Sequence, residues 1–106
     1  MSRHSPHCVE FTDHAKRDMK RLRAHAERIL RELAVLETDP FAGEAKTGSL
    51  KGVRTVAFSL PGGEYRAAYA VHPSQAVCVV FIIGPHENFY SKAERRWMSL
   101  RQRLGL

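Results

Sequence analysis

The sequence predicts an α+β fold in which a small antiparallel, meander-type sheet packs against an N-terminal helical hairpin and is followed by a C-terminal helix. Three observations predict it. Apolar residues recur at steps of three and four over residues 15–36, alternate or run unbroken through segments between residues 53 and 83, and return to helical spacing over residues 91–104. The 106 residues match the size of one compact domain. We therefore expect a single domain over residues 1–106, with residues 1–6 as a flexible leader.

The first half of the chain is predicted to form a short strand and two helices. The strand covers residues 7–11, and Thr12 or Asp13 is suited to cap the helix that follows. One apolar stripe then runs through Ala15, Met19, Leu22, Ala26, Ile29, Leu30, Leu33 and Leu36. Because this run is long for a globular helix, we expect a break near residues 24–25 that folds it into a hairpin. Asp39-Pro40 ends it, since the residue before a proline disfavours the helical conformation.

The second half is predicted to form the meander and the last helix. Residues 41–52 contain three glycines without a period, which indicates a connection. Three strands follow, separated by glycine- and proline-containing turns, over residues 53–60, 65–71 and 76–83. The third is an unbroken apolar run, so we expect it at the centre of the sheet. In the final helix, over residues 91–104, apolar residues share one face and arginines make the rest cationic.

Charge and cysteine content narrow the classes of partner and compartment. The 17 Lys and Arg against 11 Asp and Glu give a formal charge of +6. Such an excess attracts polyanions, so a nucleic acid, an acidic protein or both are expected partners. Cys8 and Cys78 form no C-x-x-C pair, and no apolar run approaches the roughly 18 residues needed to span a bilayer. We therefore expect a cytoplasmic protein. The histidines lack a ligand spacing, so neither metal nor cofactor is expected.

Two segments of the second half carry a more specific pattern. Gly63-Glu64-Tyr65-Arg66-Ala67-Ala68-Tyr69 occupies the middle predicted strand, and Ile82-Ile83-Gly84-Pro85-His86-Glu87 leads from the last strand to Tyr90. The first segment resembles the G-x-Y-R-x-x-Y strand of the RelE/ParE toxins. The second segment, the Asp39-Pro40 helix end and Leu50-Lys51-Gly52 also match that family. The resemblance covers nearly the whole chain, from Val9 to about Leu100, and implies a RelE-like fold and a toxin of a type II toxin–antitoxin system.

The resemblance also implies an activity, which is ribosome-dependent cleavage of mRNA with the RNA's own 2′-hydroxyl as nucleophile. Such a reaction needs a base for that hydroxyl, cationic donors for the phosphate and an acid for the departing 5′-oxygen. Arg66 matches the family's catalytic arginine. His86 falls where relatives carry arginine or histidine, and it suits either proton-transfer role. Tyr90 matches a tyrosine that stacks on a base or orients the hydroxyl, and Glu87 is a reserve base. The structural alternatives are an Arg66 paired with Glu64 or Glu87 and a His86 that only caps its turn.

Other basic side chains are candidates for holding RNA phosphates. Where nuclease-active relatives carry two strand lysines, this chain has Ala57 and Ser59. Lys51 and Arg54, assisted by Lys46, are the expected substitutes. Phosphate contacts from the helices would orient ribosomal RNA without specifying its sequence. The helical residues in this group are Lys20, Arg95 and Arg96. Their alternative is a solvated charged face.

The absent strand lysines keep two other functions open. One is a ParE-like toxin that blocks DNA gyrase without cutting RNA, and the other is an inert family member kept as a partner for its antitoxin. In each case we expect a cognate antitoxin to cover the basic surface. The enzyme would also bind the ribosome and mRNA, and a toxin–antitoxin hetero-oligomer would bind operator DNA through the antitoxin. No membrane partner is expected.

Overall fold

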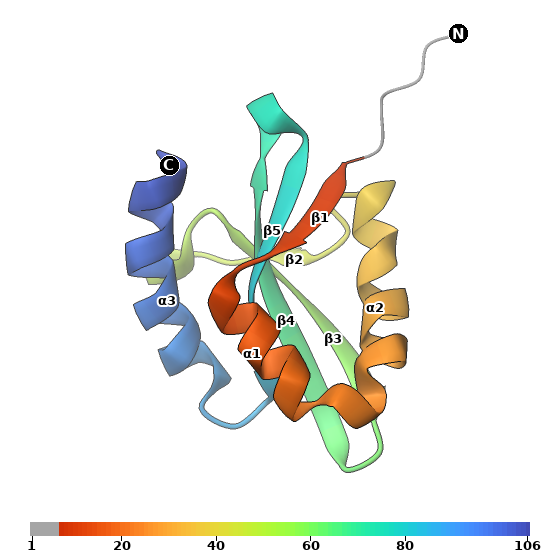
Figure 1. Ribbon diagram of the computed structural model, residues 1–106. Coiled ribbons are helices and arrows are strands. Elements are labelled where there is room, and N and C mark those ends of the chain that lie inside the picture. Colours follow the sequence, from red (N-terminus) through yellow and green to blue (C-terminus); the bar gives the residue numbers. More distant parts are fainter. Residues whose placement is uncertain (1–6) are drawn as a thin grey trace, which may run out of the picture.

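The computed structural model describes residues 7–106, so the predicted flexible leader, residues 1–6, lies outside the described residues. The regular elements are β1 (Cys8–Phe11), α1 (Asp13–Arg21), α2 (Ala26–Ala34), β2 (Glu44–Ala45), β3 (Val53–Leu60), β4 (Gly63–His72), β5 (Val77–Pro85) and α3 (Phe89–Leu104). Single turns of 3₁₀ helix lie at Arg23–His25, Val35–Glu37, Gly48–Leu50 and Pro73–Gln75. The fold is α+β with a C-terminal helix, as the sequence predicts (Figure 1).

The five-stranded sheet is mixed, and the prediction of a purely antiparallel meander is wrong in this respect. The strand order is β1-β5-β4-β3-β2. β3, β4 and β5 form the predicted antiparallel meander, but β1 pairs with β5 in parallel, with Cys8 opposite Val77. A parallel pair needs a long crossover connection, which here includes the helices α1 and α2 and the three strands β2, β3 and β4. The middle strand is therefore β4, and the apolar strand β5 lies between β4 and β1.

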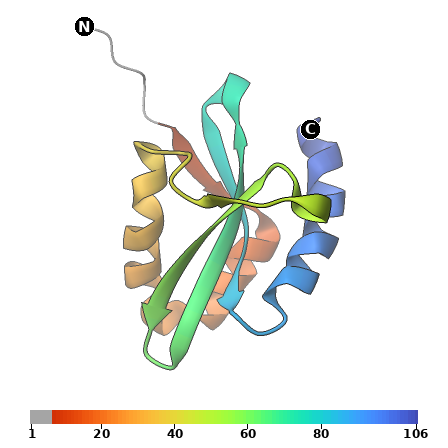
Figure 2. The same ribbon diagram turned by 180° about the vertical axis from the view of Figure 1, so that it is seen from behind.

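The predicted break in the helical run is confirmed by the 3₁₀ turn at Arg23–His25, but the two helices do not form a clear hairpin. Thr12 caps α1, because its side-chain oxygen accepts a hydrogen bond from the amide of Ala15 at 3.1 Å. α1 packs on β5, and residues of both helices contribute to the core on one face of the sheet. Figures 1 and 2 show α3 on the opposite side of the sheet from α2.

Alternation along the strands divides the core between the two faces of the sheet. Phe58 and Leu60 of β3 face α1 and α2, whereas Val53 faces α3. Ala93, Trp97 and Leu100 of α3 are buried, which confirms the predicted apolar face of the last helix. Leu30 departs from its predicted stripe and is 49 % exposed, because α2 presents a narrower apolar face than the spacing indicates.

The connection from α2 to β3 is anchored by the buried tyrosine of the G-x-Y-R-x-x-Y segment. The Tyr69 hydroxyl donates to the Pro40 carbonyl at 2.8 Å and accepts from the Gly43 amide at 2.9 Å. Burial raises the pKa of this phenol above its usual value. Gly43 allows the close approach, since a Cβ atom there would lie 2.8 Å from both the Tyr69 hydroxyl and the Thr55 carbonyl. Tyr69 is therefore a structural residue.

An ion pair covers the part of β5 that β1 does not reach. β1 pairs only as far as Val80, and the next outward-facing groups of β5 bond to side chains instead. Asp18 accepts the Ile83 amide at 2.9 Å, and Arg96 donates to the Phe81 carbonyl at 3.0 Å. The two side chains are joined by an Nη1–Oδ2 contact of 2.7 Å. This pair ties α1 and α3 to the same strand edge. Within residues 7–106, no helix is long and apolar enough to cross a membrane.

Candidate functional site

The candidate site is centred on Arg66, which lies on the α3 face of β4. Arg66 lies opposite Ala57 of β3 and Gly84 of β5. A Cβ atom on Gly84 would meet no atom within 4 Å, so the space beside the arginine is open. The Arg66 side chain is 20 % exposed, which means that it is held in place by its neighbours yet reaches solvent.

The guanidinium of Arg66 contacts three different side chains. Its Nε donates to His86 Nδ1 at 3.1 Å, and its Nη1 donates to the Tyr90 hydroxyl at 3.1 Å. Its Nη2 forms an ion pair with Glu64 at 3.0 Å. The structure thus brings together Arg66, His86 and Tyr90, three of the four predicted catalytic residues. It adds Glu64, which the sequence did not suggest as catalytic.

The contact with Arg66 shows which nitrogen of His86 accepts a hydrogen bond. An arginine Nε–H can only donate, so His86 Nδ1 is the acceptor in this arrangement. The remaining nitrogen, Nε2, then carries the proton. Nδ1 is therefore the atom of His86 able to take up a proton once Arg66 moves away.

A tight turn between β5 and α3 sets the positions of His86 and Tyr90. The His86 amide donates to the Glu64 carbonyl at 3.2 Å, which holds the turn against β4. Asn88 takes a left-handed conformation with φ of 58°, and α3 begins at the next residue. Phe89 is buried, and its ring packs edge-on against the Tyr90 ring, with 5.2 Å between the ring centres. Tyr90 packs partly against the core under α3, and its hydroxyl reaches Arg66.

Lys46 is the second cation at this site. Its Nζ lies 5.1 Å from the centre of the Tyr90 ring and 3.6 Å from Glu44. β2 holds the residue in place, because the Lys46 amide donates to the Val53 carbonyl at 2.9 Å. The positive charge of Lys46 therefore lies beside the same aromatic ring that Arg66 contacts.

Several other predicted residues lie elsewhere or have structural partners. Arg54 donates to the carbonyls of Phe41 and Gly43, at 3.0 and 2.6 Å, so its guanidinium holds the loop before β3. Glu87 lines a cavity between α1 and α3, and no contact between Glu87 and Arg66 is found in residues 7–106. The exposed candidates are Lys20, Lys51 and Arg95. Arg96, the remaining helical candidate, is engaged by Asp18.

Glu64 is the residue that sequence reasoning treated only as a structural partner. It lies two residues before Arg66, so both side chains leave the same face of β4. Ser59 lies opposite Glu64, and Ala57 lies opposite Arg66. The side chains of Ala57 and Ser59 are exposed on the same face of the sheet as the site. These two positions, where nuclease-active relatives are expected to carry lysine, therefore lie beside the Arg66–Glu64 pair. Among the described residues, no group of three His, Cys, Asp or Glu side chains could hold a metal ion.

The family is decided by a match over most of the chain. A family model for the ParE-like toxin of type II bacterial toxin–antitoxin systems matches residues 9–94. The chain belongs to this family. The RelE/ParE resemblance is thus confirmed, and a toxin of such a system has a cognate antitoxin as its partner. No curated protein is similar enough in sequence to match this toxin.

Solved structures show that the toxin has a RelE-like fold. A mutant of E. coli toxin RelE in the free state is 21% identical, with a TM-score of 0.68 over 86% of this chain and 97% of the other. The toxin–antitoxin complex RelBE2 from Mycobacterium tuberculosis gives 21% identity and a TM-score of 0.64, over 76% of this chain and 99% of the other. The archaeal RelE–RelB complex from Pyrococcus horikoshii gives 21% identity and a TM-score of 0.55, over 77% of this chain and 97% of the other.

Proposed function

We propose that this toxin is a ribosome-dependent endoribonuclease that cleaves mRNA in the cytoplasm and thereby inhibits translation and growth. The observation that carries the proposal is the cluster in which one arginine contacts a histidine, a tyrosine and a carboxylate on an open face of the sheet. These are the residue types that phosphodiester cleavage by a neighbouring hydroxyl requires, which are a cationic donor and groups able to accept and release protons.

The proposed reaction assigns one role to each of three residues. Arg66 turns its guanidinium from His86 to the scissile phosphate, where parallel N–H groups match two phosphate oxygens. His86 Nδ1, released by that movement, takes the proton of the 2′-hydroxyl. The 2′-oxygen then bonds to phosphorus as the bond to the 5′-oxygen breaks. Tyr90 Oη accepts from Arg66, which leaves the hydroxyl hydrogen available for transfer to the departing 5′-oxygen. The products are a 2′,3′-cyclic phosphate and a 5′-hydroxyl.

Glu64 controls whether Arg66 is available to the substrate. Its carboxylate occupies one edge of the guanidinium at 3.0 Å, so a phosphate has to replace it there. The Glu64 side chain is about half exposed, which keeps this exchange between two ion pairs inexpensive in solvation. Glu64 therefore orients Arg66 in the free toxin and weakens its hold on phosphate.

The ribosome supplies what the site lacks. With Ala57 and Ser59 beside Arg66, only Lys46 adds a further positive charge in contact with the cluster within residues 7–106. In free mRNA the 2′-hydroxyl is rarely in line with the bond to the 5′-oxygen, and reaching that geometry costs entropy. A decoding site that holds the codon rigidly removes this entropic cost. The exposed residues Lys20, Lys51 and Arg95 are proposed to hold ribosomal RNA through its phosphates.

The proposal is tested in a purified translation system with a defined mRNA. The expected result is cleavage within translated codons that leaves 2′,3′-cyclic phosphate ends and requires ribosomes. Arg66→Lys keeps the charge but loses the paired donors, so cleavage should fall by about 10²-fold or more. Arg31→Glu, on the exposed side of α2, is the control and should cleave normally. Intact mRNA with the wild-type toxin would refute the proposal.

A second candidate is inhibition of DNA gyrase. It is favoured by the ParE-like family model and by the absence of lysine at Ala57 and Ser59. The same purified toxin, added to a gyrase supercoiling assay, separates the two functions. Loss of supercoiling beside intact mRNA would select the gyrase target.

A further inference from the structure

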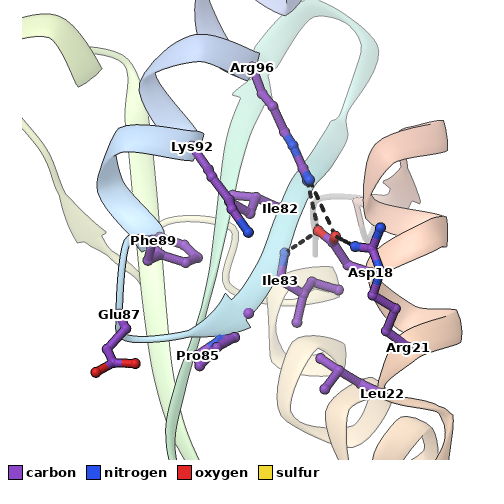
Figure 3. Close-up of a pocket in the computed structure, with 11 residues that line it drawn as sticks. Asp18, Arg21, Leu22, Ile82, Ile83, Pro85, Glu87, Phe89, Lys92 and Arg96 are labelled. Atoms are coloured by element: carbon purple, nitrogen blue, oxygen red, sulfur yellow. Dashed lines mark hydrogen bonds and ion pairs between the residues drawn. The ribbon is translucent and has the colours of Figure 1, made fainter.

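A small cavity lies between α1, the end of β5 and the start of α3, apart from the Arg66 cluster. Its volume is about 130 Å³. Apolar side chains line one part of it, namely Leu22, Ile83 and Phe89. Figure 3 shows Lys92 and Arg21 reaching toward the cavity from α3 and α1 on either side. Three basic residues, Arg21, Lys92 and Arg96, line the cavity beside two carboxylates, Asp18 and Glu87, so the cavity combines an apolar interior with a rim of net positive charge.

The cavity exists because the sheet edge is incompletely covered. β1 stops pairing at Val80, and the Asp18–Arg96 pair satisfies β5 only between Phe81 and Ile83. Beyond Ile83 the strand continues to Pro85 with neither a neighbouring strand nor a side chain bonded to its outer edge within the described part of the chain. The helices α1 and α3 flank this open stretch.

The charges of the rim are only partly neutralised. Asp18 is 6 % exposed, and its carboxylate already bonds to the Ile83 amide and to Arg96. Arg21 reaches the same carboxylate at 3.4 Å but is 72 % exposed, so most of its guanidinium faces solvent. Lys92 is exposed. Neighbouring hollows along the two helices carry more cations, namely Arg17, Arg95 and Arg103.

The size of the cavity limits what can enter it. Pockets for small-molecule ligands generally measure about 300–1,000 Å³, more than twice this volume. An apolar protein cavity of about 150 Å³ takes up a molecule the size of benzene, which is close to the size of one leucine side chain. We propose that this cavity receives one aliphatic side chain from an acidic segment of the antitoxin, whose flanking carboxylates pair with Lys92 and Arg21.

The lining favours a protein segment over RNA. A nucleotide base would need an exposed aromatic face on which to stack, and the ring of Phe89 is only 2 % exposed. A phosphate would gain nothing from Leu22 and Ile83. An aliphatic side chain with neighbouring carboxylates matches both parts of the cavity, and a toxin with a net charge of +6 attracts such a segment over longer distances.

The cavity also borders the turn that carries the candidate site. Gly84, Pro85 and Glu87 line it, and His86 lies between the last two. A segment seated in the cavity would therefore lie against the turn that positions His86. The inference rests on the antitoxin partner and not on the nuclease activity. A negative result for the antitoxin contact would therefore leave the proposed nuclease activity unaffected, and the reverse also holds.

The test uses the full-length toxin, labelled with ¹⁵N, and two blocked peptides of equal charge. One is Asp-Glu-Leu-Glu-Asp, and the other has serine in place of leucine. The leucine peptide should shift the amide signals of Ile83, Phe89 and Lys92 and bind about tenfold more tightly than the serine peptide, because only leucine fills the cavity. Lys92→Glu should weaken its binding about fivefold. Arg31→Glu on α2, the matched charge reversal, should not.

Each other outcome overturns the proposal. Equal binding of the two peptides would mean that charge alone attracts them, and shifts centred outside the cavity would place the contact elsewhere. A Lys92→Glu variant that binds normally would remove the ionic part of the argument. A uridine hexanucleotide that shifts the same three amides more strongly than the leucine peptide would assign the cavity to RNA.

Discussion

Asp18 should be among the most sensitive positions for stability, although it lies outside the proposed catalytic cluster. Its carboxylate is 6 % exposed and compensates Arg96, which is itself 18 % exposed, through contacts of 2.7 and 3.3 Å. It also accepts the Ile83 amide, which has no strand to bond to. Asp18→Ala would leave a largely buried guanidinium without its counter-ion, bonded only to the Phe81 carbonyl, and a buried amide without its acceptor. The expected loss in the free energy of unfolding is about 3–5 kcal/mol, a large share of the stability of a small domain.

Urea unfolding, followed by the fluorescence of the single buried tryptophan, Trp97, measures this loss. Arg21→Ala removes the exposed partner of the same carboxylate and is the control, with an expected effect of about 0.5 kcal/mol or less. An Asp18→Ala variant that loses less than about 1 kcal/mol would show that the ion pair does not compensate buried charges.

Three further predictions follow from the core and the site. Gly43→Ala should cost about 1–3 kcal/mol in thermal unfolding, because its Cβ would lie 2.8 Å from the Tyr69 hydroxyl and from a backbone carbonyl, and an unchanged melting temperature would contradict this close approach. Burial raises the pKa of Cys78 from 9.0 to about 11, so the stability linked to the protonated thiol is complete below pH 9 and is lost as the pH rises to about 11, by about 2–3 kcal/mol. Cys78→Val should remove this part of the pH dependence in urea titrations. If the variant lost as much stability as wild type between pH 9 and about 11, the loss would not come from the Cys78 thiol. Ala57→Lys places an ammonium opposite Arg66 and should increase ribosome-dependent cleavage about tenfold, whereas unchanged cleavage would mean that this strand position does not face the RNA.

The parts of the fold that sequence analysis predicted are those with a local period. β3 alternates and begins and ends as predicted, and the apolar face of α3 follows from helical spacing alone. The pairing of β1 with β5 joins residues almost 70 positions apart, and no local pattern records which strands meet or in which direction. β2 has two residues, too few to produce any alternation. These are the features that the predicted meander lacked.

The same distinction applies to the candidate site. Arg66, His86 and Tyr90 were found because they stand within recognisable motifs, and the fold brings them into contact. Glu64 could have been found from the two-residue strand period that it shares with Arg66.

The basic residues were harder to sort. Arg96 pairs with an aspartate 78 positions away, and Arg54 bonds to carbonyls in an irregular loop. In sequence both look like the solvated cations around them. A buried partner distant in the chain is therefore what separates a structural arginine from a candidate for RNA binding.

The most direct test of the central claim is primer extension on a reporter mRNA after brief induction of the toxin, with wild type compared with His86→Ala. His86 is exposed and contacts Arg66 through its ring, so the substitution should leave the fold intact. Cuts within translated codons that appear with wild type and vanish with His86→Ala are the predicted result. Arrested growth with intact mRNA, or cuts that persist in the variant, would contradict it.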